Sequence, residues 1–178
     1  MNYHNITVDD MLNGDGLRTV LWVSGCSHHC RGCQNPQTWD ENSGIPFDDR
    51  AKAELFSDLS RDYMDGITFS GGDPLCACNR DTVGSLITEI HDRFPEKTIW
   101  LYTGDLFEHI RDIPFLPLID VLVDGPYVES LRDPQLHWKG SRNQRVIDVK
   151  RTLAEGDVYK RQGQAWQRVY PLQALARR

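Results

Sequence analysis

Three cysteines lie close together near the start of the chain, at a spacing that suits a metal centre. Cys26, Cys30 and Cys33 fall within a run of eight residues that reads CSHHCRGC. Thiolates are soft ligands that suit iron–sulfur clusters or zinc. Closed structural zinc sites have four ligands, commonly two pairs of cysteines, whereas this run offers three. We therefore expect a 4Fe-4S cluster with three cysteine ligands, which leaves its fourth iron open for a substrate.

Other interpretations of the cysteines stay open. Zinc could bind in the same loop if it recruited His28, His29 or Cys76, and the thiols could also be unligated. Cys76 and Cys78 follow a separate turn. We expect these two to be incidental, because free cysteine often serves as a small apolar residue. We expect both histidines to face solvent or a partner rather than a metal.

The cysteine loop must be positioned by neighbouring elements, and the hydrophobic pattern predicts alternating strands and helices. Apolar and β-branched runs predict four strands, at residues 19–24, 67–70, 98–103 and 119–123. Apolar residues at helical spacing predict helices over about 48–63, 79–94 and 106–111. This order favours a parallel sheet with right-handed crossovers.

Four unusual loops each follow the carboxyl end of a predicted strand. They are the cysteine loop, the turn Gly71-Gly72-Asp73-Pro74, the pair Thr103-Gly104 and the pair Asp124-Gly125. In parallel α/β folds the functional site is built at this edge of the sheet, so we expect the four loops to converge. A full eight-unit barrel needs roughly 250 residues, more than the 178 of this chain. The fold class we expect is α/β, as an open partial barrel with a mainly parallel sheet.

Composition and charge narrow the class of protein. Apolar residues make up 39% and charged residues 26% of the chain, which is typical of a globular rather than a disordered protein. No run approaches the roughly 20 apolar residues that span a membrane, and the polar N-terminus lacks a secretion signal. We therefore expect a cytoplasmic protein without membrane association. The net charge of −6 argues against nonspecific nucleic-acid binding.

The C-terminal residues differ in character from the rest. We expect residues 1–155 to form one domain, because the alternating pattern runs through them without a linker. Residues 156–178 show little helical or strand periodicity and are basic, whereas the preceding part is acidic. We expect this tail to be a disordered extension, a docking arm for a partner, or an artefact of sequence assembly.

Further motifs around the cysteines resemble those of one enzyme family. The cysteine spacing, followed by Gly-Gly-Asp-Pro, is similar to that of the radical S-adenosylmethionine (SAM) enzymes. Six more segments resemble the glycyl-radical-activating branch: NGDGLRT (13–19), SG (24–25), QNP with TW (34–39), SGGDPL (70–75), VLVDGPY (121–127) and WKGSRNQR (138–145). Over about residues 1–150 the chain resembles the activating proteins of anaerobic ribonucleoside-triphosphate reductases.

The resemblance implies that SAM chelates the open iron through its amino and carboxylate groups. The residues it places against SAM are Gly32, Cys33, Gln34, Gly71, Gly72, Asp73, Thr103 and Asp124. Glycines allow a close approach of the backbone, and a carboxylate such as that of Asp73 accepts charge-assisted hydrogen bonds from an amine. Asp73 stands where the wider superfamily often has Glu. No side chain is expected to act as a general acid or base.

The resemblance also implies a reaction and partners. A flavodoxin-type protein would reduce the cluster, and the electron would cleave SAM into methionine and a 5′-deoxyadenosyl radical. This radical would take a hydrogen atom from a glycine in the large subunit of the anaerobic ribonucleoside-triphosphate reductase. The alternatives are an activase of another glycyl-radical enzyme, another radical SAM enzyme, and a non-enzymatic zinc or iron–sulfur module.

Overall fold

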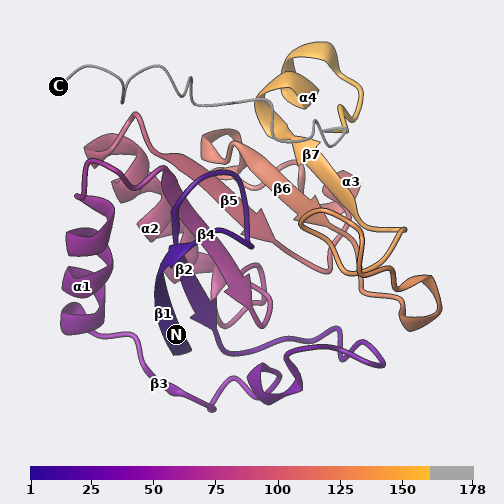
Figure 1. Ribbon diagram of the computed structural model, residues 1–178, viewed down its shortest axis with the longest axis horizontal. Helices are drawn as coiled ribbons and strands as arrows, with labels where there is room; N and C mark the ends of the chain where they lie inside the picture. Colours follow the sequence, from indigo (N-terminus) through magenta and orange to yellow (C-terminus); the bar gives the residue numbers. More distant parts are fainter. Residues whose placement is uncertain (161–178) are drawn as a thin grey trace, which may run out of the picture.

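A seven-stranded sheet runs through the part of the chain that the computed structural model describes, residues 1–160 (Figure 1). Its strands are β1 (Asn2–Asp10), β2 (Arg18–Val23), β3 (Ile45–Pro46), β4 (Gly66–Gly71), β5 (Thr98–Tyr102), β6 (Val121–Asp124) and β7 (Arg145–Asp148). The α-helices are α1 (Asp49–Leu59), α2 (Arg80–Arg93), α3 (Phe107–Ile110) and α4 (Val149–Glu155). Short 3-10 helices span Pro36–Thr38, Leu116–Leu118 and Glu129–Leu131.

The centre of the sheet is parallel and its two margins are antiparallel. The strand order is β3-β1-β2-β4-β5-β6-β7. Strands β2, β4, β5 and β6 pair in parallel, and β1, β3 and β7 pair in antiparallel fashion. The four predicted strands are therefore confirmed, as is an α/β class with a parallel centre.

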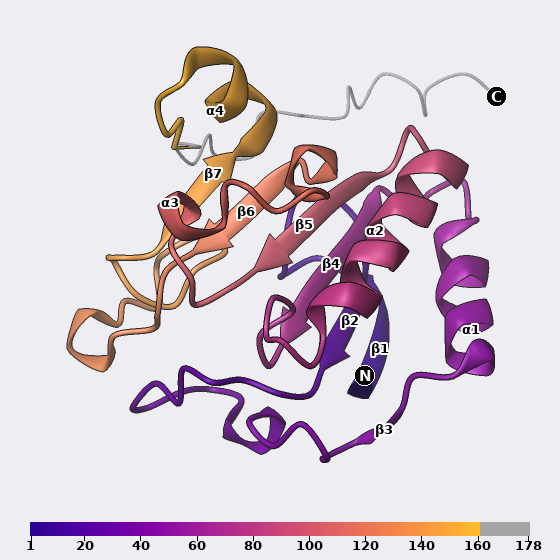
Figure 2. The same ribbon diagram turned by 180° about the vertical axis from the view of Figure 1, so that it is seen from behind.

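One face of the sheet carries the main hydrophobic core. Four aligned residues from the parallel strands, Leu21, Phe69, Leu101 and Leu122, lie side by side in register and are fully buried. Helices α1 and α2 cover this face (Figure 2), because each has an apolar stripe at helical spacing. Asp48 begins α1 by accepting a hydrogen bond from the Ala51 amide.

The opposite face of the sheet has a smaller, aromatic core. Trp100 packs there with three buried valines of β6 and β7, and Tyr102 and Trp138 pack against this cluster. Trp138 comes from the long loop between β6 and β7, and its ring lies edge-on to Trp100 with centroids 5.0 Å apart. Because this loop rather than a helix covers the face, space remains for a cleft.

A buried arginine closes the aromatic face near the amino ends of the parallel strands. The Arg18 guanidinium donates to the Thr68 hydroxyl at 2.8 Å and to the carbonyl oxygens of Ile67 and Thr98 at 2.6 and 2.8 Å. Its side chain is fully buried, and burial lowers its pKa to about 10.

The structure adds elements that the sequence pattern did not predict. The margin strands β1, β3 and β7 and the helix α4 were missed, and α1 ends at Leu59, earlier than the predicted 63. Beyond Glu155 the chain also contacts the sheet, since the Asp148 amide donates to the Tyr159 carbonyl at 3.1 Å. The expected tail of residues 156–178 lies, from residue 161 onward, outside the described residues.

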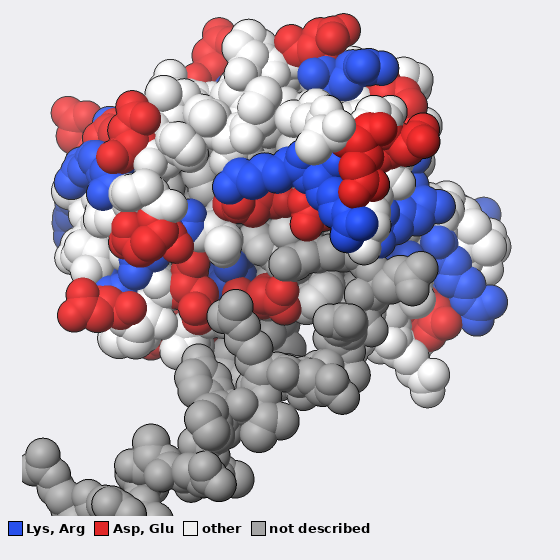
Figure 3. Space-filling view, turned by 90° about the horizontal axis from the view of Figure 1, so that it is seen from above, with Lys and Arg blue, Asp and Glu red and all other residues white. Residues whose placement is uncertain are grey.

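The surface and the helices give two further facts about the described residues. In the view of Figure 3, acidic and basic side chains lie side by side. Among residues 1–160, no helix is both long enough and apolar enough to cross a bilayer.

Candidate functional site

A cleft of about 540 Å³ opens at the carboxyl ends of the parallel strands. It brings together most of the residues that the sequence singles out: Cys26, Cys30, Cys33, Gln34, Gly71, Gly72, Asp73 and Thr103. The expected convergence of loops is therefore observed for the cysteine loop, the Gly-Gly-Asp turn and the segment after β5. Gly125, from the loop after β6, also lines the cleft.

The cysteine loop is held at both of its ends. The Gly25 amide donates to the Thr38 carbonyl at 2.7 Å, and the Cys26 amide donates to the Trp39 carbonyl at 3.0 Å. Between these ends, the Cys33 amide donates to the Cys30 carbonyl at 3.1 Å and forms a tight turn. All three cysteines are free thiols and partly buried. They can therefore offer three sulfur ligands to one centre inside the cleft.

The thiol of Cys26 is shifted toward its protonated form. Burial raises its pKa, with a smaller contribution from the negative charge of Asp73. Because a metal binds the thiolate, loading of the site must release protons. This set of three thiolate donors fits an iron–sulfur cluster, because such clusters are held by cysteine thiolates.

The Gly-Gly-Asp turn lies directly against the start of the cysteine loop. The Gly72 amide donates to the Val23 carbonyl and the Asp73 amide donates to the Gly25 carbonyl, both at 2.8 Å. A Cβ atom at Gly72 would collide with the backbone of Gly25, so this close approach requires glycine. The turn and the cysteine loop are thus one hydrogen-bonded unit.

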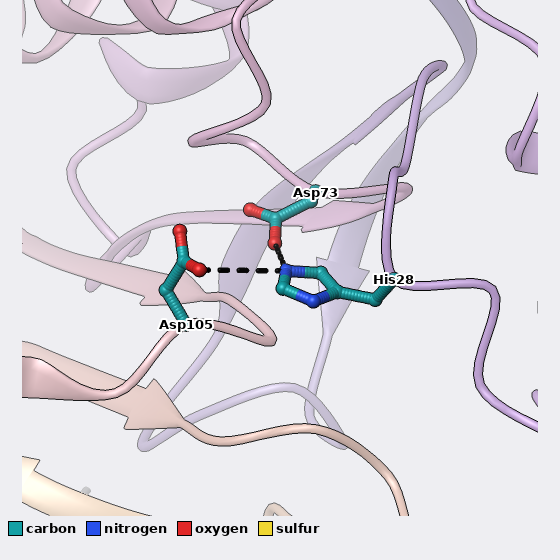
Figure 4. Close-up of side chains that lie close together, drawn as sticks. All are labelled: His28, Asp73 and Asp105. Atoms are coloured by element: carbon teal, nitrogen blue, oxygen red, sulfur yellow. Dashed lines mark hydrogen bonds and ion pairs between the residues drawn. The ribbon is translucent and has the colours of Figure 1, made fainter. Parts of the chain in front are cut away.

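The carboxylate of Asp73 is buried and receives four hydrogen bonds from the protein. Its Oδ2 accepts from His28 Nε2 at 2.7 Å, and from the Thr103 hydroxyl and the Gly104 amide at 3.0 Å each. Its Oδ1 accepts from the Leu75 amide at 2.8 Å. Figure 4 shows the Nε2 edge of the His28 ring directed at Asp73, with Asp105 near the same nitrogen. Asp73 therefore joins the cysteine loop to the loops after β4 and β5.

His28 is a site residue that the sequence reasoning missed. It was expected to face solvent or a partner, yet only 21% of its side chain is exposed and its ring points inward at Asp73. The hydrogen bond to Asp73 raises the pKa of His28. A Cβ atom at Gly104 would collide with the ring, so a glycine makes room for it. No local pattern reveals a contact between residues 45 positions apart.

The ligand atoms of His28, Asp73 and Asp105 lie within 4.8 Å of one another, a spacing that could suit a metal ion. The contacts argue for a structural role instead. Asp73 Oδ2 already accepts three hydrogen bonds, and Asp105 Oδ1 is 3.8 Å from His28 Nε2. The group therefore ties loops together.

Two expected SAM-binding residues do not line the cleft. Gly32 lies in the cysteine loop, where it adopts a φ of +73° beside the Glu129 side chain. Asp124 is fully buried. Its carboxylate accepts a hydrogen bond from the Phe107 amide at 2.8 Å and pairs with the Arg145 guanidinium. Asp124 thus positions the following Gly125 rather than facing the cleft.

Aromatic residues form much of the remaining wall. Trp22 and Tyr102 line the cleft together with Tyr127 and Trp138. The alternation of strand side chains places Trp22 and Tyr102 on the face away from the helices.

Comparison with known proteins assigns the family. A family model described as a 4Fe-4S single cluster domain matches residues 12–147. A protein of Enterobacteria phage T4 is 45% identical over 146 residues, which cover 82% of this chain and 93% of that protein. A protein of Escherichia coli (strain K12) is 43% identical over 154 residues, covering 84% of this chain and all of that protein.

A protein of Haemophilus influenzae is 39% identical over 154 residues, which cover 84% of this chain and 99% of that protein. All three relatives carry the name anaerobic ribonucleoside-triphosphate reductase-activating protein. The sequence identity extends over almost the full length of each relative, and the cleft of this chain gathers three cysteines. These two findings assign the family of the chain. The chain belongs to the family of anaerobic ribonucleoside-triphosphate reductase-activating proteins.

Proposed function

We propose that this protein activates the anaerobic ribonucleoside-triphosphate reductase by generating a glycyl radical on its large subunit. When bound, the 4Fe-4S cluster supplies one electron that cleaves SAM, and a hydrogen atom is then taken from a glycine of the partner. The observation that carries the proposal is the convergence of three cysteines and the Gly-Gly-Asp turn in one cleft. The membership of the chain in the activating-protein family supports it.

Cys26, Cys30 and Cys33 are the proposed cluster ligands, with the fourth iron left for SAM. All three line the cleft, whereas Cys76 and Cys78 are not among its lining residues. The Cys33 sulfur also accepts a hydrogen bond from the Asn35 amide at 3.3 Å. Hydrogen bonds to cluster sulfurs are among the means by which a protein adjusts a reduction potential.

The proposed SAM contacts divide into backbone and side-chain roles. Gly71, Gly72 and Gln34 line the cleft and can offer backbone groups to SAM. Asp73 is occupied by four donors of the protein itself, so we assign the methionyl amine to the backbone of the turn that Asp73 holds. The Thr103 hydroxyl donates one of these four hydrogen bonds, so we assign Thr103 the role of holding Asp73 in place. Gly32 and Asp124 act by shaping the cysteine loop and the loop after β6.

The architecture supports entry of a partner segment. We propose that β2, β4, β5 and β6 form an open partial barrel of the radical SAM type, with the cleft on its inner, aromatic face. The loop of residues 125–144 forms one wall, and the reductase supplies the missing one when its glycine-bearing loop enters.

A flavodoxin-type protein is the proposed electron donor, and the cytoplasm is the proposed compartment. Residues 1–155 are the proposed catalytic domain.

Reconstitution with iron and sulfide under anaerobic conditions tests the proposal. The loaded protein, given dithionite and SAM, should release 5′-deoxyadenosine and methionine. With the reductase present, electron paramagnetic resonance should show a glycyl radical. Cys26→Ser, Cys30→Ser and Cys33→Ser should each abolish 5′-deoxyadenosine release and the glycyl radical and lower the iron content. Cys76→Ser should leave all three unchanged.

Two results would reject the proposal. If zinc binds tightly and no 5′-deoxyadenosine forms with the iron-loaded protein, the non-enzymatic metal module is correct. If SAM is cleaved but the radical appears only on another glycyl-radical enzyme, the partner assignment is wrong.

A further inference from the structure

Cys76 and Cys78 lie close enough together to react with each other. Their sulfur atoms are 3.3 Å apart, in the turn that joins β4 to α2. Both side chains are partly exposed, and both are free thiols. Neither is among the residues lining the cleft. The proposed cluster needs the other three of the five cysteines, so these two remain available as a pair of thiols.

The pair is built into the support of the cysteine loop. A Cβ atom at Gly25 would collide with the Cys78 sulfur, so this sulfur lies directly against the residue before Cys26. Asn79 follows Cys78 and is buried. Its side-chain amide donates to the carbonyl oxygens of Ser24 at 2.7 Å and Asp73 at 2.9 Å. The thiol pair therefore sits beside the junction of the two loops that form the cleft.

The two sulfurs have different surroundings. Burial, the neighbouring Cys76 thiol and the Glu41 carboxylate together raise the pKa of Cys78 to about 12. Cys78 is therefore poorly ionised at neutral pH. Since the thiolate is the nucleophile in thiol–disulfide exchange, Cys76 is the thiol that attacks first and Cys78 the one that resolves.

We propose that Cys76 and Cys78 are a redox-active pair that forms an intramolecular disulfide when the protein meets a low-molecular-weight disulfide. The Cys76 thiolate attacks one sulfur of the oxidant and releases the first thiol, leaving a mixed disulfide on Cys76. The Cys78 sulfur, after losing its proton, attacks the Cys76 sulfur and releases the second thiol. The protein loses two electrons and two protons, and one molecule of the oxidant becomes two thiols.

The geometry requires little movement for this step. A disulfide has a sulfur–sulfur distance of about 2.05 Å, so closing the 3.3 Å gap needs only a small shift of two partly exposed side chains.

Anaerobic thiol mapping of the iron-loaded protein tests the inference. The protein is incubated with oxidised glutathione, quenched in acid, alkylated and digested for mass spectrometry. The peptide with Cys76 and Cys78 should lose the mass of two hydrogen atoms and take up no alkyl group. Cys78→Ser should instead accumulate one glutathione on Cys76, because the resolving thiol is gone. Cys76→Ser should react far more slowly.

The inference rests on the proposed function only in leaving Cys76 and Cys78 outside the cluster. Thiol mapping distinguishes failure of the redox pair from failure of the proposed function. Before oxidant is added, both cysteines should alkylate while iron is bound. If they are protected together with the iron, the ligand assignment fails. If they alkylate freely but the wild-type protein forms only a stable glutathione adduct, or no adduct, the redox pair is refuted and the proposed activity stands.

Discussion

At the scale of the residue, Asp73 shows how this protein keeps a buried charge. A buried carboxylate is costly unless it is hydrogen-bonded, and Asp73 meets this condition with four donors from three separate segments. Each donor also fixes the segment that carries it. A single carboxylate thus sets the relative positions of the cysteine loop, the Gly-Gly-Asp turn and the segment after β5.

Replacing His28 with alanine should weaken the binding of SAM about tenfold, because a hydrogen bond to a charged group contributes about 1.5–3 kcal/mol and its loss loosens the turn. Equilibrium binding of SAM to the reconstituted protein measures the effect, with iron content determined in parallel. His29→Ala is the matched control, since His29 stacks on Trp39 with centroids 4.9 Å apart instead of contacting Asp73. An unchanged SAM affinity in His28→Ala would contradict this role.

At the scale of the element, the residue that precedes α2 stabilises the candidate site rather than capping the helix. Asn79 occupies the N-cap position but makes no capping bond. Its side chain instead spans from the end of β2 to the Gly-Gly-Asp turn. The helix, the strand and the turn therefore move as one body.

Asn79→Ala should lower the free energy of unfolding by about 2 kcal/mol, because it leaves the Ser24 carbonyl oxygen without a donor and removes one of the two donors to the Asp73 carbonyl oxygen. Urea denaturation of the iron-free protein, followed by circular dichroism, measures the change. Asn42→Ala, at an exposed position, should cost much less. An equal loss of unfolding free energy in the two variants would show that Asn79 stabilises the fold no more than an exposed asparagine does.

A second element-scale feature is the ion-pair cluster that joins β7 to β6 and α3. Arg145 contacts Glu108 at 2.8 Å and also pairs with the buried Asp124. The hydrogen bond from Arg145 lowers the pKa of Glu108 to about 2. Because this folded-state pKa lies below its ordinary value of 4.5, ionised Glu108 stabilises the fold above pH 4.5, and the contribution is lost as the pH falls toward 2.

Glu108→Gln should therefore lower the melting temperature at neutral pH, and the difference from the wild type should vanish at about pH 2. Thermal unfolding of the iron-free protein across this range provides the measurement. The effect is modest because half of the Glu108 side chain is exposed to solvent. Glu96→Gln, whose partner Lys97 is 3.9 Å away, is the control and should show little pH-dependent difference. A difference that persists unchanged to pH 2 would contradict the assignment.

At the scale of the whole molecule, the sequence predicts the parallel centre of the sheet better than its margins. Residues 119–123 were recognisable because they are mostly apolar, as is typical of a buried parallel strand. Residues 67–70 were recognisable from β-branched and aromatic residues that end at a glycine-rich turn. Strand β1 is polar and is specified by its pairing with β2, and β7 spans only four residues. The topology predicted at which edge of the sheet the candidate site lies. The orientation of the His28 side chain was not predictable, because its contact with Asp73, 45 residues away in the sequence, determines it.

The C-terminal residues allow a test at the same scale. Truncation after Lys160 should leave SAM cleavage and the melting temperature unchanged, because the match to the 4Fe-4S family model ends at residue 147. Truncation after Glu155 should lower the melting temperature by about 2–4 °C for each kcal/mol lost, since it removes the Tyr159 backbone contact and the packing of Val158. SAM cleavage per bound iron should persist in both. Loss of cleavage in the shorter variant alone would extend the domain to Lys160.

The two hydrogen bonds that close the base of the cysteine loop, from Gly25 to Thr38 and from Cys26 to Trp39, join backbone groups only. The frame of the loop is therefore independent of the side chains that it carries. A serine in place of a cysteine removes a sulfur ligand and keeps both of these bonds. Loss of iron in such a variant consequently reports on the missing sulfur rather than on an opened loop.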